Sequence, residues 1–310
     1  MSDQGVEVWS GGVNTWECDE MGHMNVRFWA AKALEGLAGL AAVLGMPRAF
    51  AADGEATVVV REQHIRFLRE AHAGASLHAT GGVIEIGESD ARLLVVVRHP
   101  NGDPAATFQL LVEHVTSRDL RAFPWPARIR AKADALRVPL PAYAAARSLD
   151  LSPVTATAGL PRALELGLTR IGLGVVGPPE CDVFGRMRPE MFIGRVSDGV
   201  PKLFGEVRPG PEPVPGEPPP RIGGAVLEYR VLHLDWPQAG DGVELRSGLV
   251  DCNARTRRVV HWMVDPQSGR PWASAEAVAI SFDLDRRKVV DISAAALDAY
   301  RAQLRPGLAL

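Results

Sequence analysis

Apolar residues recur at helical spacing directly after residue 25. The series is Phe28, Trp29, Ala33, Leu34, Leu37, Leu40, Ala41 and Leu44. Steps of three and four residues are typical of an α-helix, and Gly45 and Pro47 favour its end. Because the apolar positions occupy much of the circumference, we expect other elements to wrap this helix.

Four strand-like segments follow the helix, at residues 56–70, 76–87, 91–99 and 105–115. The last two are separated by Pro100-Asn101-Gly102-Asp103, in which Asn-Gly strongly favours a hairpin turn. Sequential strands joined by short turns predict an antiparallel sheet.

The second half of the chain repeats this order. Segments 227–234, 242–253, 257–264 and 272–282 match the four strands of the first half. Corresponding positions keep nearly constant offsets, since Asp182 follows Asp19 by 163 positions and Gly240 follows Gly74 by 166. The pattern indicates a tandem duplication.

The repeat also predicts the domain boundaries. We expect one domain at residues 1–140, a linker at 141–168 and a second domain at 169–310. Prolines punctuate the linker region, whereas the proline-rich stretch 209–220 falls inside the second repeat, between its helix and its first long strand. Segments 127–137 and 293–303 correspond, so each repeat is expected to end in a short helix.

Composition narrows the function classes. The chain has 310 residues, 46% of them hydrophobic and 23% charged, with a net charge of −3. This balance gives no basic face for nucleic acid, and no apolar run approaches the roughly 20 residues of a membrane span. Three cysteines, Cys18, Cys181 and Cys252, and an N-terminus without a signal-peptide pattern favour a cytoplasmic protein.

The chemistry-bearing stretch lies at the entry of the predicted helix. Asp19 precedes Gly22-His23-Met24-Asn25, and the first amides of a helix lack intrahelical partners and carry partial positive charge. A carbonyl oxygen docked on those amides would be polarised beside Asp19. A degraded copy follows at residues 180–188, where Asp182 persists but Arg186 and Arg188 replace the His and the Asn.

This helix and sheet pattern, with Asp-x-x-Gly-His-x-Asn at the helix entry, resembles the hotdog-fold thioesterases, in particular the 4-hydroxybenzoyl-CoA and acyl-CoA thioesterase group. The resemblance covers residues 7–138 and 170–305. It implies an α+β fold of two tandem hotdog domains, each a curved antiparallel sheet wrapped around a central helix, with an intact motif in the first and a degenerate motif in the second.

The resemblance also assigns roles in the first repeat. Asp19 falls on the catalytic carboxylate of the family, and His23 and Asn25 fall on its Gly-His-x-Asn turn. Phe28 takes the aromatic position of the helix, and Glu35 matches an acidic position seen in some branches. We expect Phe28 and Glu35 to line an acyl pocket, although a buried Glu35 would need a partner.

Thioester hydrolysis needs attack on the carbonyl carbon and stabilisation of the resulting oxyanion. Asp19 could act as general base or as nucleophile, and amides at Met24, Asn25 and Val26 could bind the oxyanion. Purely structural roles stay open, because Asp19 could close an Asx-type turn and Asn25 could simply cap the helix. His23 could orient the reactants or hold the turn.

Phosphate groups of coenzyme A call for arginine or lysine. The basic cluster Arg255, Arg257 and Arg258, in a strand-to-strand turn of the second repeat, is the candidate, with an ordinary solvated turn as the alternative. Cys18, Asp19 and His23 do not complete a metal-ligand set, so neither a metal nor a cofactor is expected.

These observations predict an acyl-CoA thioesterase, acting on a fatty or aromatic acyl-CoA, with one intact site per chain. A non-catalytic acyl-CoA or acyl-carrier binding protein is the alternative, and a hotdog hydratase or dehydratase ranks last because no Asp-x-Asn-Pro-x-His arrangement is present. We also expect two chains to associate as a homodimer.

Overall fold

The computed structural model describes residues 5–204, 210–211 and 220–310. The chain divides into two compact units, one comprising Met1–Arg147 and Gly177–Met191, the other Ser148–Val176 and Phe192–Leu310. The segment Gly177–Met191, which carries the degenerate motif, therefore belongs with the first unit. The predicted boundaries at residues 140 and 169 stay a prediction.

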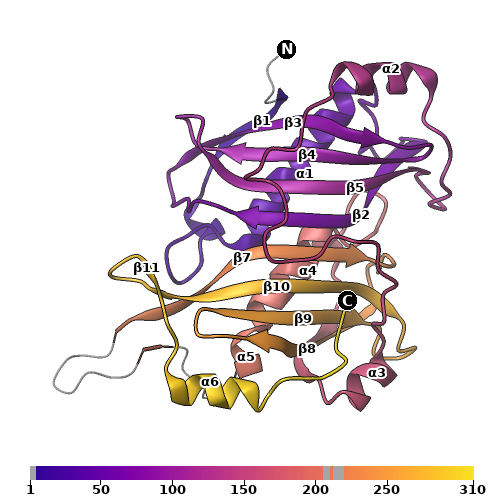
Figure 1. Cartoon of the computed structure of the whole chain (residues 1–310). Coiled ribbons are helices and arrows are strands. Elements are labelled where there is room, and N and C mark those ends of the chain that lie inside the picture. The colour runs from indigo at the N-terminus through magenta and orange to yellow at the C-terminus, as the bar shows by residue number, and fades with distance from the viewer. Residues whose placement is uncertain (1–4, 205–209, 212–219) are drawn as a thin grey trace. The chain divides into compact units, whose positions relative to one another are not determined.

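The first unit is built on an antiparallel sheet with the strand order β1-β3-β4-β5-β2 (Figure 1). The strands are β1 (Val6–Gly12), β2 (Ala56–Phe67), β3 (Ser76–Ile86), β4 (Asp90–Arg98) and β5 (Pro104–Thr116). The four strands expected from the sequence are confirmed. Strand β1 was not predicted, because its seven residues end in Ser-Gly-Gly and lack a sustained alternation of apolar and polar positions.

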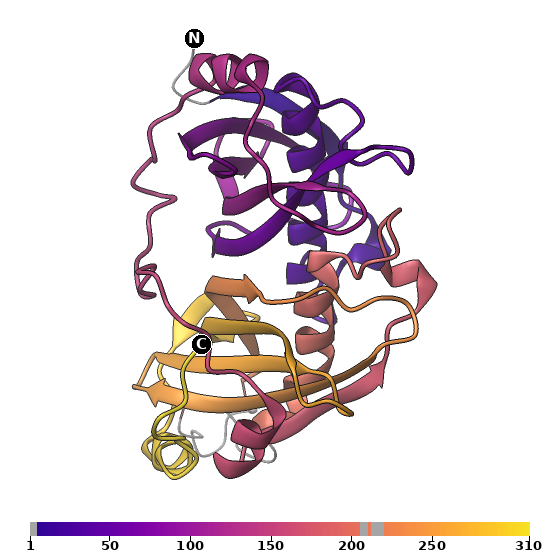
Figure 2. The same ribbon diagram turned by 90° about the vertical axis from the view of Figure 1, so that its right-hand side faces the viewer.

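Helix α1 (Val26–Val43) contacts β1, β3 and β4 and lies along one side of this sheet (Figures 1 and 2). It begins at Asn25, whose side-chain oxygen accepts a hydrogen bond from the Arg27 amide at 2.9 Å, so the predicted N-cap is confirmed. A Cβ atom at Gly39 would lie 2.2 Å from the Val8 carbonyl oxygen. Glycine at this position therefore permits the close crossing of α1 and β1.

The end of the first predicted domain and the start of the predicted linker cover the sheet of the first unit. Helix α2 (Ala127–Ala135) contacts β3. The segment that follows joins a small hydrophobic cluster comprising Leu94, Val96, Val138 and Ala144. The Gln109 side chain donates a hydrogen bond to the Ala144 carbonyl at 2.8 Å. The beginning of the linker is therefore anchored on the first unit through buried Ala144.

The second unit repeats the plan, with the strand order β7-β10-β9-β8-β6 and β11 paired with β10. Its strands are β6 (Thr169–Val175), β7 (Ile222–His233), β8 (Gly242–Cys252), β9 (Thr256–Val264), β10 (Pro271–Asp283) and β11 (Lys288–Val290). Its helices are α3 (Leu160–Glu165), α4 (Pro189–Gly199), which begins in the first unit, α5 (Pro201–Phe204) and α6 (Ala294–Arg301). Helix α6 contacts β8 as α2 contacts β3, so the expected terminal helices are confirmed.

Two further expectations concern the second half. The proline-rich stretch 209–220 lies almost entirely outside the described residues, between α5 and β7. Among the helices that are described, none is both long and apolar enough to cross a bilayer.

Candidate active site

The predicted site is a tight loop between a 3₁₀ turn at Thr15–Glu17 and the start of α1. Asp19 Oδ1 accepts hydrogen bonds from the amides of Met21 at 3.0 Å and His23 at 3.1 Å. The Asp19 amide in turn donates to the His23 carbonyl at 2.8 Å. Gly22 has a φ of 79°, a conformation that favours glycine. Asp19 thus closes an Asx-type turn, the structural role left open by the sequence.

The two oxygens of the Asp19 carboxylate have different surroundings. Oδ1 is occupied by the turn amides, whereas Oδ2 has no hydrogen-bond or ion-pair partner among the described residues. The side chain is half-buried. One oxygen therefore maintains the turn and the other is available for chemistry, so the structural role does not exclude a catalytic one.

A buried ion pair, missed by the sequence analysis, fixes this loop to the helix. Lys32 Nζ lies 2.8 Å from Glu17 Oε1, and both side chains are buried. Glu17 Oε2 accepts a hydrogen bond from the Asn14 amide at 2.8 Å, and the Glu17 carbonyl accepts one from the Asn25 amide at 2.9 Å. A lysine within an apolar helix indicates a buried charge that needs a partner, but the partner lies 15 residues away and the sequence does not identify it.

The helix start offers fewer free amides than expected. The Met24 amide donates to the Ala71 carbonyl at 2.8 Å, and the Asn25 amide donates to Glu17. The Arg27 amide is taken by the Asn25 cap. Of the three predicted oxyanion donors, only Val26 has an amide without an acceptor in the described part of the chain. The roles proposed for the Met24 and Asn25 amides are therefore corrected, because backbone carbonyls occupy them.

The His23 side chain lies toward the loop between β2 and β3. Its Nε2 atom is 3.6 Å from Glu70 Oε1, and its ring centroid is 5.1 Å from that of His72. The hydrogen bonds between His23 and Asp19 involve the His23 backbone. The structure therefore brings the side chain of His23 to two residues, Glu70 and His72, that the sequence analysis did not single out.

Phe28 and Glu35 were expected in an acyl pocket. Phe28 is half-buried, with the Arg27 guanidinium 5.2 Å from its ring centroid. Glu35 is exposed, and its Oε2 atom accepts a hydrogen bond from Trp9 Nε1 at 2.6 Å. The acid therefore has a partner from β1 but is not buried, and the pocket assignment of both residues stays a prediction.

The three arginines predicted to bind phosphate have separate environments. Arg257 is 3% exposed and donates to Ser281 Oγ at 2.8 Å, and burial lowers the pKa of its guanidinium. Arg258 donates to Glu276 through Nε at 2.8 Å, and exposed Arg255 pairs with Asp291 at 2.8 Å. Because burial withholds Arg257 from a ligand, the expected cluster is not formed.

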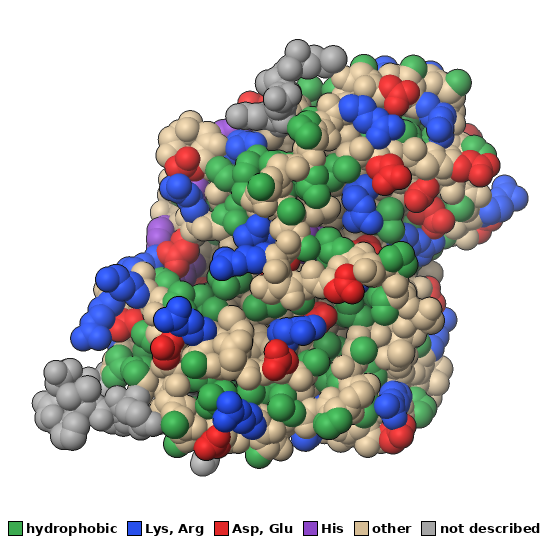
Figure 3. All heavy atoms as spheres, viewed as in Figure 1, with side chains coloured by type: hydrophobic (Ala, Val, Ile, Leu, Met, Phe, Trp, Pro, Cys, Tyr) green, Lys and Arg blue, Asp and Glu red, His purple; other side chains and the backbone are tan. Residues whose placement is uncertain are grey.

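Arg258 and Glu276 line a hollow of about 240 Å³ in the second unit. Arg230 also lines it and donates to the Asp150 carbonyl at 2.7 Å. On the face drawn in Figure 3, Lys and Arg side chains are interspersed with Asp and Glu, in keeping with the net charge of −3.

The degenerate loop has the same turn with a different side-chain partner. Asp182 Oδ1 accepts from the amides of Phe184 at 2.8 Å and Arg186 at 3.0 Å. Asp182 Oδ2, however, accepts a hydrogen bond from Arg186 Nε at 3.2 Å. The second carboxylate therefore has both oxygens occupied.

The residue that replaces the N-cap asparagine is also engaged. Arg188 NH1 lies 3.2 Å from Glu190 Oε1. Burial raises the pKa of Glu190, and the charges of Arg188 and Arg27 oppose that rise. The helix start of the second copy thus has an arginine–glutamate ion pair where the first copy has Asn25 and Arg27.

A central helix against an antiparallel sheet, present twice in tandem, defines the double-hotdog class of protein. The sequence matches the thioesterase-like superfamily over residues 13–133 and 176–300, well over half of the chain. The chain therefore belongs to this superfamily and is a thioester hydrolase. No curated protein sequence matches it.

Several solved structures share the fold. A protein assigned as an oleoyl thioesterase from Lactobacillus plantarum superposes with a TM-score of 0.65 and 12% identity, covering 87% of this chain and 94% of that one. An acyl-ACP thioesterase from Bacteroides thetaiotaomicron superposes with a TM-score of 0.64 and 10% identity, covering 90% of this chain and 100% of that one. The 12:0-ACP thioesterase from Umbellularia californica superposes with a TM-score of 0.63 and 11% identity, covering 88% of this chain and 92% of that one.

Proposed function

We propose that the chain hydrolyses the thioester of a fatty or aromatic acyl-CoA at the loop that precedes α1. The proposal depends on the different surroundings of the two Asp19 carboxylate oxygens. Oδ1 accepts the hydrogen bonds of the turn, whereas Oδ2 has no partner among the described residues. The same loop leads into a helix start whose Val26 amide has no acceptor among the described residues. An attacking group and an oxyanion donor therefore come from one short segment.

In the general-base route, Asp19 Oδ2 removes a proton from water, and the resulting hydroxide bonds to the thioester carbonyl carbon. The carbonyl oxygen becomes an oxyanion that the Val26 amide stabilises. Collapse of this intermediate breaks the carbon–sulfur bond, and the proton held by Asp19 passes to the leaving thiolate. The products are a free acid and CoA.

In the nucleophilic route, Asp19 Oδ2 itself bonds to the carbonyl carbon and the thiolate leaves, giving a mixed anhydride that water then hydrolyses. Both routes keep Oδ1 on the turn amides and use the same oxyanion donor. An amide in this role contributes about 3 kcal/mol to transition-state stabilisation. The positive end of the helix dipole acts in the same direction.

The second loop is proposed to be inactive. Arg186 donates a hydrogen bond to Asp182 Oδ2, the oxygen that corresponds to the open Oδ2 of Asp19. The Arg186 guanidinium also lies 4.7 Å from the Phe184 ring centroid. A carboxylate oxygen that already accepts a hydrogen bond from a guanidinium is not available to take a proton from water or to attack a carbonyl carbon. We therefore propose one working site per chain.

The test is release of CoA thiol from short, medium, long and aromatic acyl-CoAs by the full chain. The wild type is compared with Asp19→Ala and with the matched control Asp182→Ala. Turnover that disappears only in Asp19→Ala supports the proposal, and the panel identifies the acyl class. Turnover that survives Asp19→Ala, or disappears only in Asp182→Ala, contradicts it.

Two further readouts separate the remaining alternatives. Mass spectrometry of acid-quenched enzyme detects an acyl group on Asp19 if the nucleophilic route operates. Binding of acyl-CoA without any thiol release by the wild type would identify an acyl-CoA or acyl-carrier binding protein instead. Light scattering of the full chain tests the proposed homodimer.

A further inference from the structure

Three metal-ligating side chains meet beside the active-site loop of the first unit. His23 belongs to the Gly-His turn, whereas Glu70 and His72 belong to the loop between β2 and β3. One potential ligand atom from each residue lies within 4.8 Å of the others. His23 is 12% exposed at its side chain, Glu70 38% and His72 56%, so the group is reachable from solvent.

The distances are close to those of a zinc site. Glu70 Oε1 is 3.6 Å from His23 Nε2, and Glu70 Oε2 is 3.9 Å from His72 Nε2. Zinc bonds of about 2.0–2.1 Å in tetrahedral geometry place ligand atoms roughly 3.3 Å apart. The two contacts use different oxygens of Glu70, and one ligand atom from each residue lies within 4.8 Å of the others. Their separations must therefore shorten by at most roughly 1.5 Å to reach coordination distance.

The tautomer of His72 is suited to metal binding. Its Nδ1 atom lies 2.9 Å from the Gly22 carbonyl oxygen, which can only accept, so Nδ1 carries the hydrogen. In a neutral ring the lone pair is then on Nε2, the atom nearer Glu70. A backbone carbonyl bonded to the other ring nitrogen is the usual way in which proteins orient a ligating histidine.

The backbone brings the two loops together without a metal. His23 and His72 form an isolated antiparallel bridge, and the Met24 amide donates to the Ala71 carbonyl at 2.8 Å. The Gly74 amide adds a hydrogen bond to the Val13 carbonyl at 2.8 Å. Because the ligands sit on loops already joined by hydrogen bonds, little ordering is needed on binding.

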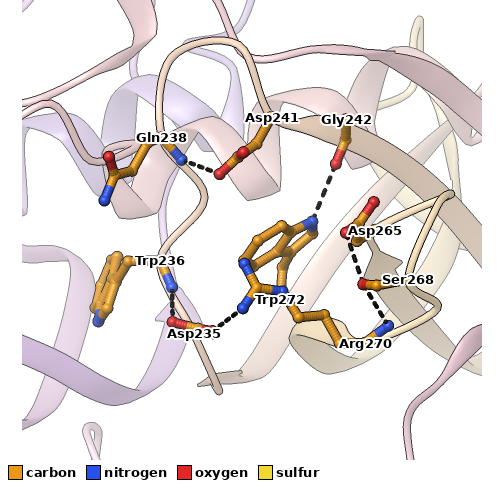
Figure 4. Close-up of polar contacts among 9 residues, drawn as sticks. All are labelled: Asp235, Trp236, Gln238, Asp241, Gly242, Asp265, Ser268, Arg270 and Trp272. Atoms are coloured by element: carbon orange, nitrogen blue, oxygen red, sulfur yellow. Dashed lines mark hydrogen bonds and ion pairs between the residues drawn. The ribbon is translucent and has the colours of Figure 1, made fainter.

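The second repeat keeps this scaffold but not the ligands. The Ala75 amide donates to the His72 carbonyl at 3.0 Å, and the Asp241 amide donates to the Gln238 carbonyl at 2.9 Å, which aligns His72 with Gln238 and Glu70 with Trp236. Figure 4 shows the equivalent loop, in which the Gln238 amide donates to Asp241 Oδ2 at 2.7 Å. The loop therefore folds without a His-Glu-His set.

We propose that His23, Glu70 and His72 bind one Zn²⁺ ion, with water in the fourth position. Two imidazoles and one carboxylate form a ligand set that zinc accepts with an open coordination site. The site is independent of the proposed thioester hydrolysis, although it shares the Gly22-His23 turn. Its binding can therefore be measured without any substrate.

The experiment uses the untagged full chain, freed of metal by a chelator, with Co²⁺ as the spectroscopic probe and Zn²⁺ as the competitor. We expect the wild type to bind one equivalent of Co²⁺ with the visible absorption of a four-coordinate site, and Zn²⁺ to displace it. His72→Gln, which installs the residue of the second repeat, and Glu70→Gln should each weaken binding at least about tenfold.

His78→Gln is the matched control, because His78 lies on neighbouring β3 outside the cluster. It should bind like the wild type. Circular dichroism and thermal unfolding confirm that each variant is folded, and the exposure of His72 and Glu70 makes both substitutions compatible with the fold. Absence of a stoichiometric Co²⁺ complex in the wild type, or equal binding by His72→Gln and the wild type, overturns the proposal and leaves a histidine–carboxylate contact only.

Discussion

The two helix-entry loops have the same backbone turn and differ in the partner of the second carboxylate oxygen. Asp19 and Asp182 each accept two amide hydrogen bonds through Oδ1, and each donates its own amide four residues ahead, at 2.8 Å and 2.7 Å. Gly22 and Gly185 have φ values of 79° and 81°. The turn is thus set by aspartate and glycine alone. The residue after the glycine decides whether the second carboxylate oxygen is open or paired.

A second pair of positions makes the same point on the neighbouring loops. Arg69 NH1 lies 2.8 Å from Asp103 Oδ2 in the first repeat. At the corresponding positions Asp235 Oδ2 lies 3.2 Å from Arg270 NH1, with the charges exchanged (Figure 4). The contact is conserved between the copies while its residues are not. Divergence therefore acted on side chains over a constant scaffold, and function must be located residue by residue.

The largest expected effect comes from Asp19→Asn. An asparagine oxygen can still accept the two turn hydrogen bonds, so the fold should persist while the base or nucleophile is lost. We expect a fall in kcat of about 10²–10⁴-fold, measured by thiol release. Asp182→Asn is the control and should leave kcat within experimental error of the wild type; similar losses in both variants would contradict the division of roles.

The next largest effect is on stability. Lys32→Met leaves the buried Glu17 carboxylate without its ion-pair partner, which costs about 3–5 kcal/mol of unfolding free energy. Urea denaturation of the wild type and variant measures it. Glu17→Gln combined with Lys32→Met should recover part of the loss, since no buried charge remains. A single-variant loss below about 1 kcal/mol would mean that the pair is solvated.

His23→Arg transfers the side chain of the second loop into the first. The fold should be maintained, because Arg186 already occupies the same turn, and the new guanidinium should pair with Asp19 Oδ2 as Arg186 pairs with Asp182. We expect kcat to fall roughly 10²-fold, the lower range for loss of a general base. His23→Gln, which cannot form an ion pair, should retain more activity. A lower activity in His23→Gln than in His23→Arg would show that the ion pair of Arg186 is not the reason for the proposed inactivity of the second loop.

The smallest effect concerns acid sensitivity. His261 stands where the first repeat has Val95, and burial lowers its pKa to about 3. Its folded-state pKa lies below the unfolded value, so its contribution to stability is present above pH 6.5 and is lost as pH falls toward 3. The slope is at most about 1.4 kcal/mol per pH unit.

His261→Val should therefore flatten the dependence of unfolding free energy on pH between 6 and 4. Denaturant unfolding followed by tryptophan fluorescence at several pH values measures this difference. His114→Gln is a useful comparison, because burial also lowers the pKa of His114, but in the first repeat. An unchanged slope in His261→Val would show that the imidazole is not the source of acid sensitivity.

The sequence by itself determined the elements whose signals are local. The helical spacing, the four long strands of each repeat, the Asn25 cap and the glycine turn all depend on residues within a few positions of one another. The thioesterase motif was visible for the same reason, since Asp19 and Asn25 are six positions apart. The short strands β1 and β6 were not predicted. Strand β1 ends in Ser-Gly-Gly, and β6 alternates its apolar residues with glycines, which weaken a strand signal.

Only the tertiary structure decided which groups are free and which distant residues meet. It gave the two oxygens of Asp19 different surroundings and buried Arg257. Of the three predicted oxyanion donors, it left only the Val26 amide without an acceptor among the described residues. It also joined Glu17 to Lys32 and gathered His23 with Glu70 and His72. None of these features follows from the local sequence pattern, because hydrogen bonding and burial depend on segments that the sheet and the helix bring together. Contacts between distant segments produce no periodicity in the sequence.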